Sequence, residues 1–180
     1  MTKEDWSDNW KKFKHGDTEA FRLIYDFFFD RLYHYGRKLT SQTDLLEDCI
    51  QELFLTLYTN RKNLSDTDQL EFYLLKALKH TIYGKLRQEQ RMLRFREQAG
   101  MNFELEFLAE TGPDREIADR LEPVRKYLET LTPRSRELLY LKFYTRLDYR
   151  QIGEMLGIQA SSVKKQVYRI MSRMKEELAG

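Results

Sequence analysis

Basic and small polar side chains gather on one side of a helix predicted near the C-terminal end of the chain. Residues 160–175 contain five basic side chains and no acidic one. At about 100° per residue, the apolar side chains of this segment share one face. Ser161, Ser162, Lys165 and Arg169 lie on the far side, Gln166 and Arg173 flank it, and Lys164 sits at the border. The polar set is Ser161, Ser162, Lys164, Lys165, Gln166, Arg169 and Arg173. Such a helix suits the major groove of duplex DNA, where these side chains can hydrogen-bond base edges and phosphates.

Acidic side chains dominate one side of another predicted helix, which begins near Asp44. With one glutamine, the set is Asp44, Glu47, Asp48, Gln51 and Glu52. Three interpretations compete: a solvated surface, a metal site and a docking surface for a basic partner. The histidines, His15, His34 and His80, are not spaced to complete a metal site, so none is predicted. Taken alone, these residues do not decide between the other two interpretations.

A second basic surface is predicted on a long helix that begins near Leu70. Seven Lys or Arg residues and one Glu lie between Lys76 and Arg96. The candidates for binding a single nucleic-acid strand are Lys76, Lys79, His80, Tyr83, Arg87 and Arg91. Cations can follow a phosphate backbone while aromatic rings stack on unpaired bases, so the pattern favours single-stranded nucleic acid. The alternative is an exposed helix whose tyrosines cover the edge of the core.

The C-terminal basic surface belongs to a predicted helix-turn-helix. Thr132 is the expected N-cap of a first helix that has Pro133 at its first position. Asp148 is expected to cap a short second helix, which ends at Gly157 because the chain needs a positive φ there. The third helix is expected from about Ala160. Its apolar residues are Val163, Val167, Ile170, Met171, Met174 and Leu178. The short second helix and the charge asymmetry favour DNA binding over a solvated helical hairpin.

Apolar residues at intervals of three and four predict further helices in the first half of the chain. A short helix carries the aromatic residues of segment 6–13, and Asp17 is expected to cap a second helix that runs to about Lys38. Ser41–Asp44 offers a capping-box start for the third helix. The polar segment 60–69 is expected to be a loop before the long basic helix.

Length and composition point to an all-α protein. Glycine and proline are few among the 180 residues, and no strand-like alternation stands out. We expect two small helical domains, residues 1–97 and 125–180, joined by an acidic linker over residues 98–124. The C-terminal domain is the helix-turn-helix. Asp114–Leu128 is expected to form a helix that leads into it.

The only cysteine, Cys49, lies on the apolar side of its predicted helix, which excludes an internal disulfide and indicates a packed thiol. No apolar run approaches about 18 residues, and the N-terminus lacks a signal-peptide pattern. We therefore expect a soluble, cytoplasmic protein. The sequence contains no phosphate-binding glycine loop, nucleophile motif or metal cluster. It predicts a binding protein with no catalytic residue, metal, cofactor or small-molecule substrate.

Four motifs, in this order, resemble those of the bacterial extracytoplasmic-function (ECF) sigma factors, the small two-domain branch of the sigma-70 family. They are GDTEAF at 16–21, DLLEDCIQELF at 44–54, LTPRSRE at 131–137, and IGEMLGI at 152–158 with Val163-Lys164. The match spans nearly the whole chain with family-like spacing. The resemblance implies a protein that binds core RNA polymerase and directs promoter recognition and transcription initiation.

The resemblance also assigns roles to the three surfaces. The acidic face would dock on the coiled coil of the polymerase clamp, and the flap would be a further polymerase contact. The long basic helix and its preceding loop would open and read the downstream promoter element as a single strand. The C-terminal helix would read the upstream element as duplex, and the acidic linker would lie in the channel of the nascent RNA. An anti-sigma factor is the other partner implied.

Three positions depart from the family pattern. His80 stands where the family usually has Asn, and Gly84 where Asp is common. Gln159 replaces the usual Ser or Thr cap of the recognition helix, which predicts a less stable helix start by about 1 kcal/mol. The alternative function is a helix-turn-helix regulator that acts without joining polymerase. It would explain segment 131–178 but would leave the other two surfaces without a role, and co-purification with core polymerase separates the two functions.

Overall fold

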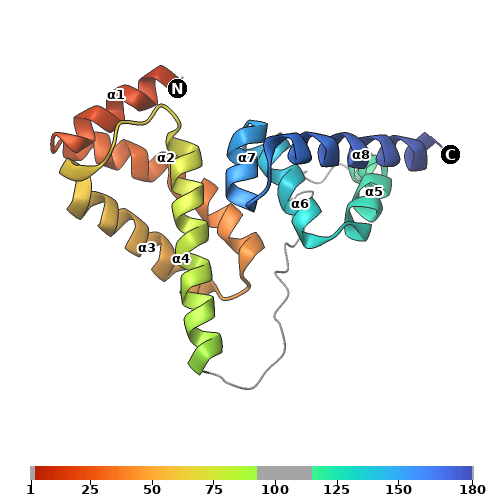
Figure 1. Ribbon diagram of the computed structural model, residues 1–180, viewed down its shortest axis with the longest axis horizontal. Coiled ribbons are helices and arrows are strands. Elements are labelled where there is room, and N and C mark those ends of the chain that lie inside the picture. The colour runs from red at the N-terminus through yellow and green to blue at the C-terminus, as the bar shows by residue number, and fades with distance from the viewer. Residues whose placement is uncertain (1–2, 93–114, 180) are drawn as a thin grey trace. The chain divides into compact units, whose positions relative to one another are not determined.

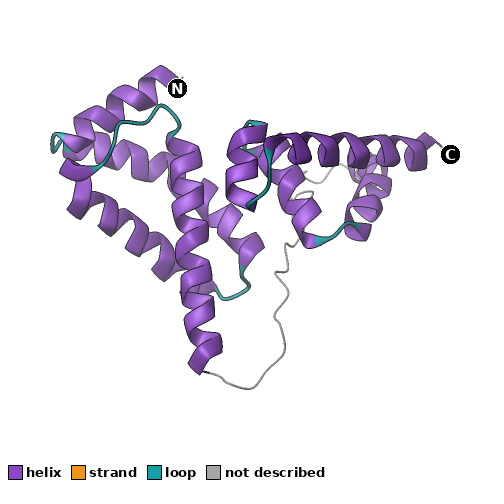
Figure 2. Cartoon of the chain, in the orientation of Figure 1, coloured by secondary structure: helices purple, strands orange, loops and turns teal. Residues whose placement is uncertain are grey.

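The computed structural model describes the backbone of residues 3–92 and 115–179, and the side chains of residues 6–89 and 121–178. Its regular elements are all helical, so the expected all-α class is confirmed (Figures 1 and 2). They are α1 Lys3–Lys14, α2 Thr18–Leu39, α3 Thr43–Asn60, the 3₁₀ turn η1 Arg61–Asn63, α4 Leu70–Met92, α5 Arg115–Thr130, α6 Pro133–Leu139, the π-helical turn η3 Tyr140–Tyr144, α7 Tyr149–Leu156 and α8 Ala160–Ala179. The chain divides into two compact units, Met1–Gly100 and Met101–Gly180.

The first unit is built around the mutual packing of α2, α3 and α4, with α1 laid against α2. Each helix buries the apolar face that its three- and four-residue spacing predicts. Side chains buried in this core include Ile24, Phe28, Leu32 and Tyr35 of α2, Leu46, Cys49 and Ile50 of α3, and Leu74, Leu75, Leu78 and Ile82 of α4. Removing these side chains from water is the main force that holds the three helices together. The outward faces of α3 and α4 are thereby held in fixed orientations.

Helix α1 also anchors the loop that precedes α4. The indole Nε1 of Trp10 donates a hydrogen bond to the backbone oxygen of Ser65 at 3.0 Å. The Lys14 ammonium lies 2.7 Å from a carboxylate oxygen of Asp66. This hydrogen bond from Lys14 lowers the pKa of Asp66. Two contacts from α1 therefore fix the approach of the chain to α4.

In this unit, the observed start of α2 agrees with the start predicted from the sequence, and the observed start of α3 differs from it. Asp17 caps α2, because its carboxylate accepts from the backbone N–H groups of Glu19 and Ala20 at 2.9 and 3.0 Å. The predicted capping box of Ser41–Asp44 is wrong. The N-cap falls one residue later, at Gln42, whose side chain makes no capping bond. The Gln42 amide instead donates to Glu89 of α4 at 3.5 Å.

In the second unit, α5, α6 and α7 all contact α8. The predicted caps are confirmed: Thr132 accepts from the Ser135 N–H at 3.2 Å, and Asp148 closes a capping box at α7. Gly157 follows α7 with φ +66°, the left-handed conformation expected of a glycine there. The buried hydroxyl of Tyr127 on α5 donates to the backbone oxygen of Ile170 at 3.0 Å. These contacts fix the outward face of α8.

Helix α5 begins at Arg115, so the C-terminal part of the expected 98–124 linker is helical. The expected helix Asp114–Leu128 corresponds to it. Residues 93–114, which hold the rest of the expected linker, lie outside the described part of the chain. No described helix is long and apolar enough to cross a membrane.

Candidate functional site

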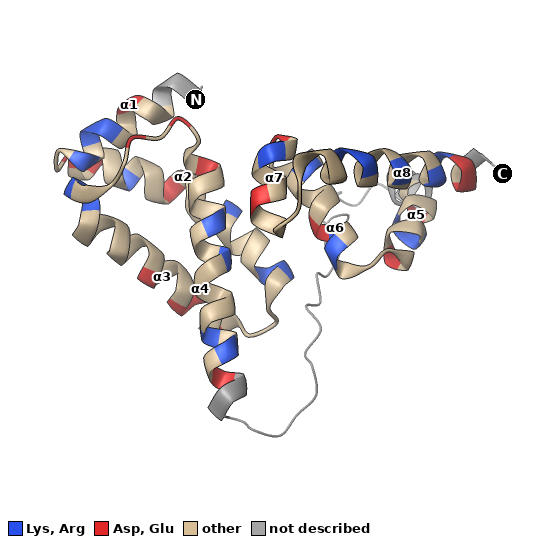
Figure 3. Ribbon diagram, viewed as in Figure 1, with Lys and Arg blue, Asp and Glu red and all other residues tan. Residues whose placement is uncertain are grey.

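All five residues of the predicted acidic face, Asp44, Glu47, Asp48, Gln51 and Glu52, are exposed on α3. The residues between them, such as Leu46 and Ile50, are fully buried. The angular interpretation of α3 is therefore confirmed at every position of the set. Positions of Asp and Glu, red in Figure 3, gather on α3 toward its contact with α4. Among the residues described, no three metal-binding side chains group together.

The same face carries apolar side chains that the sequence reasoning missed. Leu55 follows Gln51 by one helical turn and is 66% exposed, the largest value among the exposed large hydrophobic residues described. Tyr58 is also exposed, and the Arg61 guanidinium lies 4.7 Å from the centre of its ring. The signal was available, because Leu55 falls outside the apolar stripe of α3. An acidic surface that continues into apolar side chains resembles a binding surface more than a merely solvated one.

One member of the acidic face, Glu52, is already in contact with α4. Its carboxylate oxygen Oε2 lies 3.0 Å from the Lys85 ammonium. Lys85 is separated from Glu52 by 33 positions in the sequence, and by angle it points toward the core side of α4 rather than along the basic stripe. The acidic face therefore contains a cation supplied by the neighbouring helix.

The predicted single-strand surface lies on α4, with Lys76, His80 and Arg87 exposed. Lys79 and Tyr83 are half-buried. The side chain of Arg91 lies outside the described residues. Lys76, His80, Tyr83 and Arg87 face away from the buried Leu74, Leu78 and Ile82, as their angles predict, whereas Lys79 lies on the flank, about 100° from Leu78. Exposed basic side chains therefore run along the described part of α4, from Lys76 to Arg87.

Tyr83 is less available than its helical angle suggests. Its hydroxyl oxygen is buried, and the Lys79 ammonium lies 5.5 Å from the centre of its ring. The backbone oxygen of Tyr83 accepts a hydrogen bond from Arg87 Nε at 3.1 Å. The ring therefore both covers part of the core and contacts a cation, so both interpretations of Tyr83 remain.

The side chains predicted to read duplex DNA all lie on α8. Ser161, Lys164, Lys165, Arg169 and Arg173 are exposed. Ser162 and Gln166 are half-buried. Val163, Val167 and Ile170 are buried on the opposite side. The candidates therefore share one exposed side of α8, which carries four cations and small side chains.

The turn between α7 and α8 depends on a glycine that the sequence reasoning did not single out. A Cβ atom at Gly153 would lie 2.6 Å from the backbone oxygen of Ile158 and 3.3 Å from the backbone nitrogen of Ala160. The Ile158 N–H donates to the Gly153 oxygen at 2.9 Å. Since both crowding atoms belong to the backbone, no side chain can move aside. Gly153 therefore sets the distance between the two helices of the helix-turn-helix.

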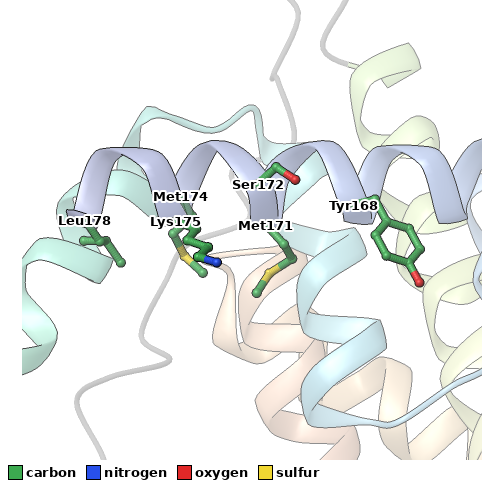
Figure 4. Close-up of a pocket in the computed structure, with 6 residues that line it drawn as sticks. All are labelled: Tyr168, Met171, Ser172, Met174, Lys175 and Leu178. Carbon is green, nitrogen blue, oxygen red and sulfur yellow. The ribbon is translucent and has the colours of Figure 1, made fainter. Parts of the chain in front are cut away.

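The end of α8 departs from expectation. Leu178, assigned to the apolar face, is 42% exposed, and Tyr168 is 60% exposed. With Met171 and Met174 they line a shallow apolar hollow along one side of α8 (Figure 4). The reason is geometric: the helices packed against α8 cover the side of Val163, Val167 and Ile170, and they leave the neighbouring stripe open.

Comparison with known families matches both units. Residues 24–92 match the family "Sigma-70 region 2", and residues 121–174 match "Sigma-70, region 4". Together the two matches cover more than half of the chain. The chain belongs to the sigma-70 family. The first match contains α3 and α4, and the second contains α7 and most of α8.

Curated relatives indicate the branch of the family. The chain is 21% identical over 175 residues to the ECF RNA polymerase sigma factor SigW of Bacillus subtilis, covering 93% of this chain and 94% of SigW. It is 23% identical over 167 residues to the ECF RNA polymerase sigma factor SigK of Mycobacterium ulcerans, covering 92% and 85% of the two chains. These matches confirm the resemblance to ECF sigma factors.

Solved structures share the fold. The sigma factor RpoE in complex with the anti-sigma factor NepR, from Bartonella quintana, aligns with a TM-score of 0.60 and 20% identity, covering 89% of this chain and 98% of RpoE. CnrH in complex with the cytosolic domain of CnrY aligns with a TM-score of 0.56 and 16% identity, covering 96% of each chain. At such identities the likeness concerns the fold alone.

Proposed function

We propose that this sigma factor binds core RNA polymerase through the exposed face of α3 and directs it to a specific set of promoters. The observation that carries the proposal is the composition of that face. Asp44, Asp48 and Leu55 stand exposed on one side of a helix whose other side is buried. Exposed carboxylates attract a basic surface and give specificity, while an apolar side chain adds affinity when it is covered. The clamp coiled coil of the polymerase is the partner that the family resemblance implies.

The two basic surfaces would then divide the promoter between them. On α8, Lys165 and Arg169 point away from the buried stripe and would reach base edges of the upstream element in duplex form. On α4, exposed cations would hold the phosphates of the downstream element after it has opened. We expect the division because α8 is the second helix of a helix-turn-helix, whereas α4 presents a stripe along a single long helix.

An anti-sigma factor is the further partner we propose. One of the solved structures named above is the complex of the sigma factor RpoE with the anti-sigma factor NepR, and the other is the complex of CnrH with the cytosolic domain of CnrY. The apolar hollow of α8 and the exposed Leu55 of α3 are surfaces that such a partner could cover. A regulator that acts on duplex DNA without polymerase remains the alternative function, and the face of α3 is the observation against it.

The test is co-purification followed by transcription. The purified protein should retain core RNA polymerase on an affinity column, and the reconstituted complex should start transcription at sites that core polymerase alone ignores. A matched variant with Lys165→Ala and Arg169→Ala should still bind polymerase but lose selective initiation. A folded wild-type protein that binds duplex DNA yet fails to retain polymerase would establish the alternative function.

A further inference from the structure

Lys85 joins the acidic face of α3 from the neighbouring helix α4. Its ammonium lies 3.0 Å from Glu52 Oε2, and the side chains of Lys85 and Glu52 are 32% and 56% exposed. The pair is therefore reachable from solvent, unlike the buried apolar contacts around it. Any cation that approaches Glu52 meets Lys85 already in place.

The surroundings keep Lys85 charged. Partial burial disfavours its ammonium, but the hydrogen bond with Glu52 and the nearby charge of Asp48 outweigh that effect and raise the pKa of Lys85. At neutral pH, one positive charge therefore stands within a face that otherwise carries four acids. It cancels part of the attraction that this face exerts on a basic partner.

The pair is not needed to hold α3 on α4. These helices are joined by buried apolar side chains, among them Leu46 and Ile50 on α3 and Leu78 on α4. An ion pair with both members open to solvent adds little to folding stability by comparison. The contact of Lys85 with Glu52 is thus better placed to affect binding at the face than to stabilise the fold.

We propose that Lys85 is an internal competitor for the polymerase-docking face: it occupies Glu52 in the free protein and must give way when a basic side chain of the polymerase binds. This inference rests on the proposed function of the α3 face. It assigns to Lys85 the role of weakening the complex, so that the free sigma factor can be exchanged or captured by another partner. A lysine that pairs with an acid of a docking surface adjusts the affinity for the polymerase, because its removal changes that affinity without removing a contact to the polymerase.

The experiment measures the affinity of core RNA polymerase for full-length variants in the absence of DNA. Lys85→Met keeps the aliphatic length of the side chain and removes its charge, so it should tighten binding by about two- to fivefold. Lys85→Arg, which keeps the ion pair, should bind like wild type. Lys62→Met removes a charge from the exposed η1 turn of the same unit and controls for net charge. It should also leave the affinity unchanged.

A double-mutant cycle then tests competition for Glu52 itself. In a Glu52→Gln background, Lys85→Met should tighten binding clearly less than it does in the wild-type background, because the competition for Glu52 is gone and only the effect of the charge on the other acids remains. Weaker binding by Lys85→Met would show that the pair only braces α3, and equal tightening in both backgrounds would show a general charge effect. Either result overturns the proposal. If wild-type protein binds no polymerase at all, the docking function fails instead, so the two failures are distinguishable.

Discussion

Reversing two exposed acids of α3 should abolish most of the affinity for core polymerase. Asp44 and Asp48 stand one helical turn apart, and both are exposed. Replacing each by lysine should leave the fold intact, because surface substitutions usually cost little. Asp44 lies in the first turn of α3, so its replacement also removes a favourable interaction with the helix dipole of about 0.3–1 kcal/mol. Glu52 is deliberately left in place, since a lysine there would meet Lys85 at 3.0 Å and could disturb the first unit by itself.

The magnitude follows from the exposure of these side chains. An exposed ion pair contributes about 0.2–1 kcal/mol, and charge reversal turns each attraction into a repulsion of similar size. For two residues the loss is about 0.8–4 kcal/mol, which weakens binding by between about fourfold and 900-fold. The loss should shrink as salt is raised, because the Debye length falls from about 10 Å at 0.1 M to about 3 Å at 1 M.

The assay is a titration of core polymerase with labelled variants at low and high salt. The matched control is Asp26→Lys with Asp30→Lys, the same charge change at the same spacing on the exposed side of α2. The control should bind within about twofold of wild type at physiological ionic strength. If the Asp44/Asp48 variant is folded by circular dichroism and still binds like the control at low salt, the face of α3 is only a solvated surface.

Three further predictions concern the turn, the duplex surface and the stripe on α4. Gly153→Ala should destabilise the second unit by about 1–3 kcal/mol in denaturant titrations, whereas Gly84→Ala, with open space around its Cβ, should be neutral or stabilising. In promoter selection, Lys165→Ala should relax base preference at one or two positions. Lys164→Ala should weaken binding to all promoter sequences alike, and the dependence of its affinity on salt concentration should fall by about one phosphate contact. In permanganate footprinting, the Tyr83→Phe variant should open promoters normally, because it keeps the ring. The Tyr83→Leu variant should open them about five- to 150-fold less well if the ring stacks on a base. Equal opening by the two variants would mean that Tyr83 only covers the core.

Helix starts and ends were predictable because their hydrogen bonds are local. The carboxylate of Asp148 and the backbone conformation of Gly157 act within a few residues, so the sequence alone contains the relevant groups. The start of α3 shows the limit of this reasoning. The segment Ser41–Asp44 has the right residue types, but the turn from α2 places the N-cap at Gln42, whose amide bonds to Glu89 from another helix.

Contacts between distant segments account for what the sequence did not show. The ion pair of Lys85 with Glu52 and the close approach of Gly153 to Ile158 both depend on how helices pack. Sequence spacing predicts neither contact, because the residues of one helix can face any part of a neighbouring helix. Leu55 is different: its exposure follows from helical angle alone, because it falls outside the apolar stripe of α3.

Helical angle predicts direction but does not predict how far neighbouring helices cover a side chain. Tyr83 lies near the pole opposite Leu78, yet its hydroxyl oxygen is buried and the Lys79 ammonium lies 5.5 Å from its ring centre. A base that stacks on the face held by Lys79 must displace or share this cation, whose interaction with an exposed ring is worth about 0.5–1 kcal/mol. Base stacking is worth about 1–3 kcal/mol, so replacing the cation by a base on the ring is favourable. The gain is too small to break a base pair as well, so the base must already be unpaired. Under the proposed function, Tyr83 would therefore hold a strand that has opened rather than open it, and the exposed cations of α4 would supply the initial attraction.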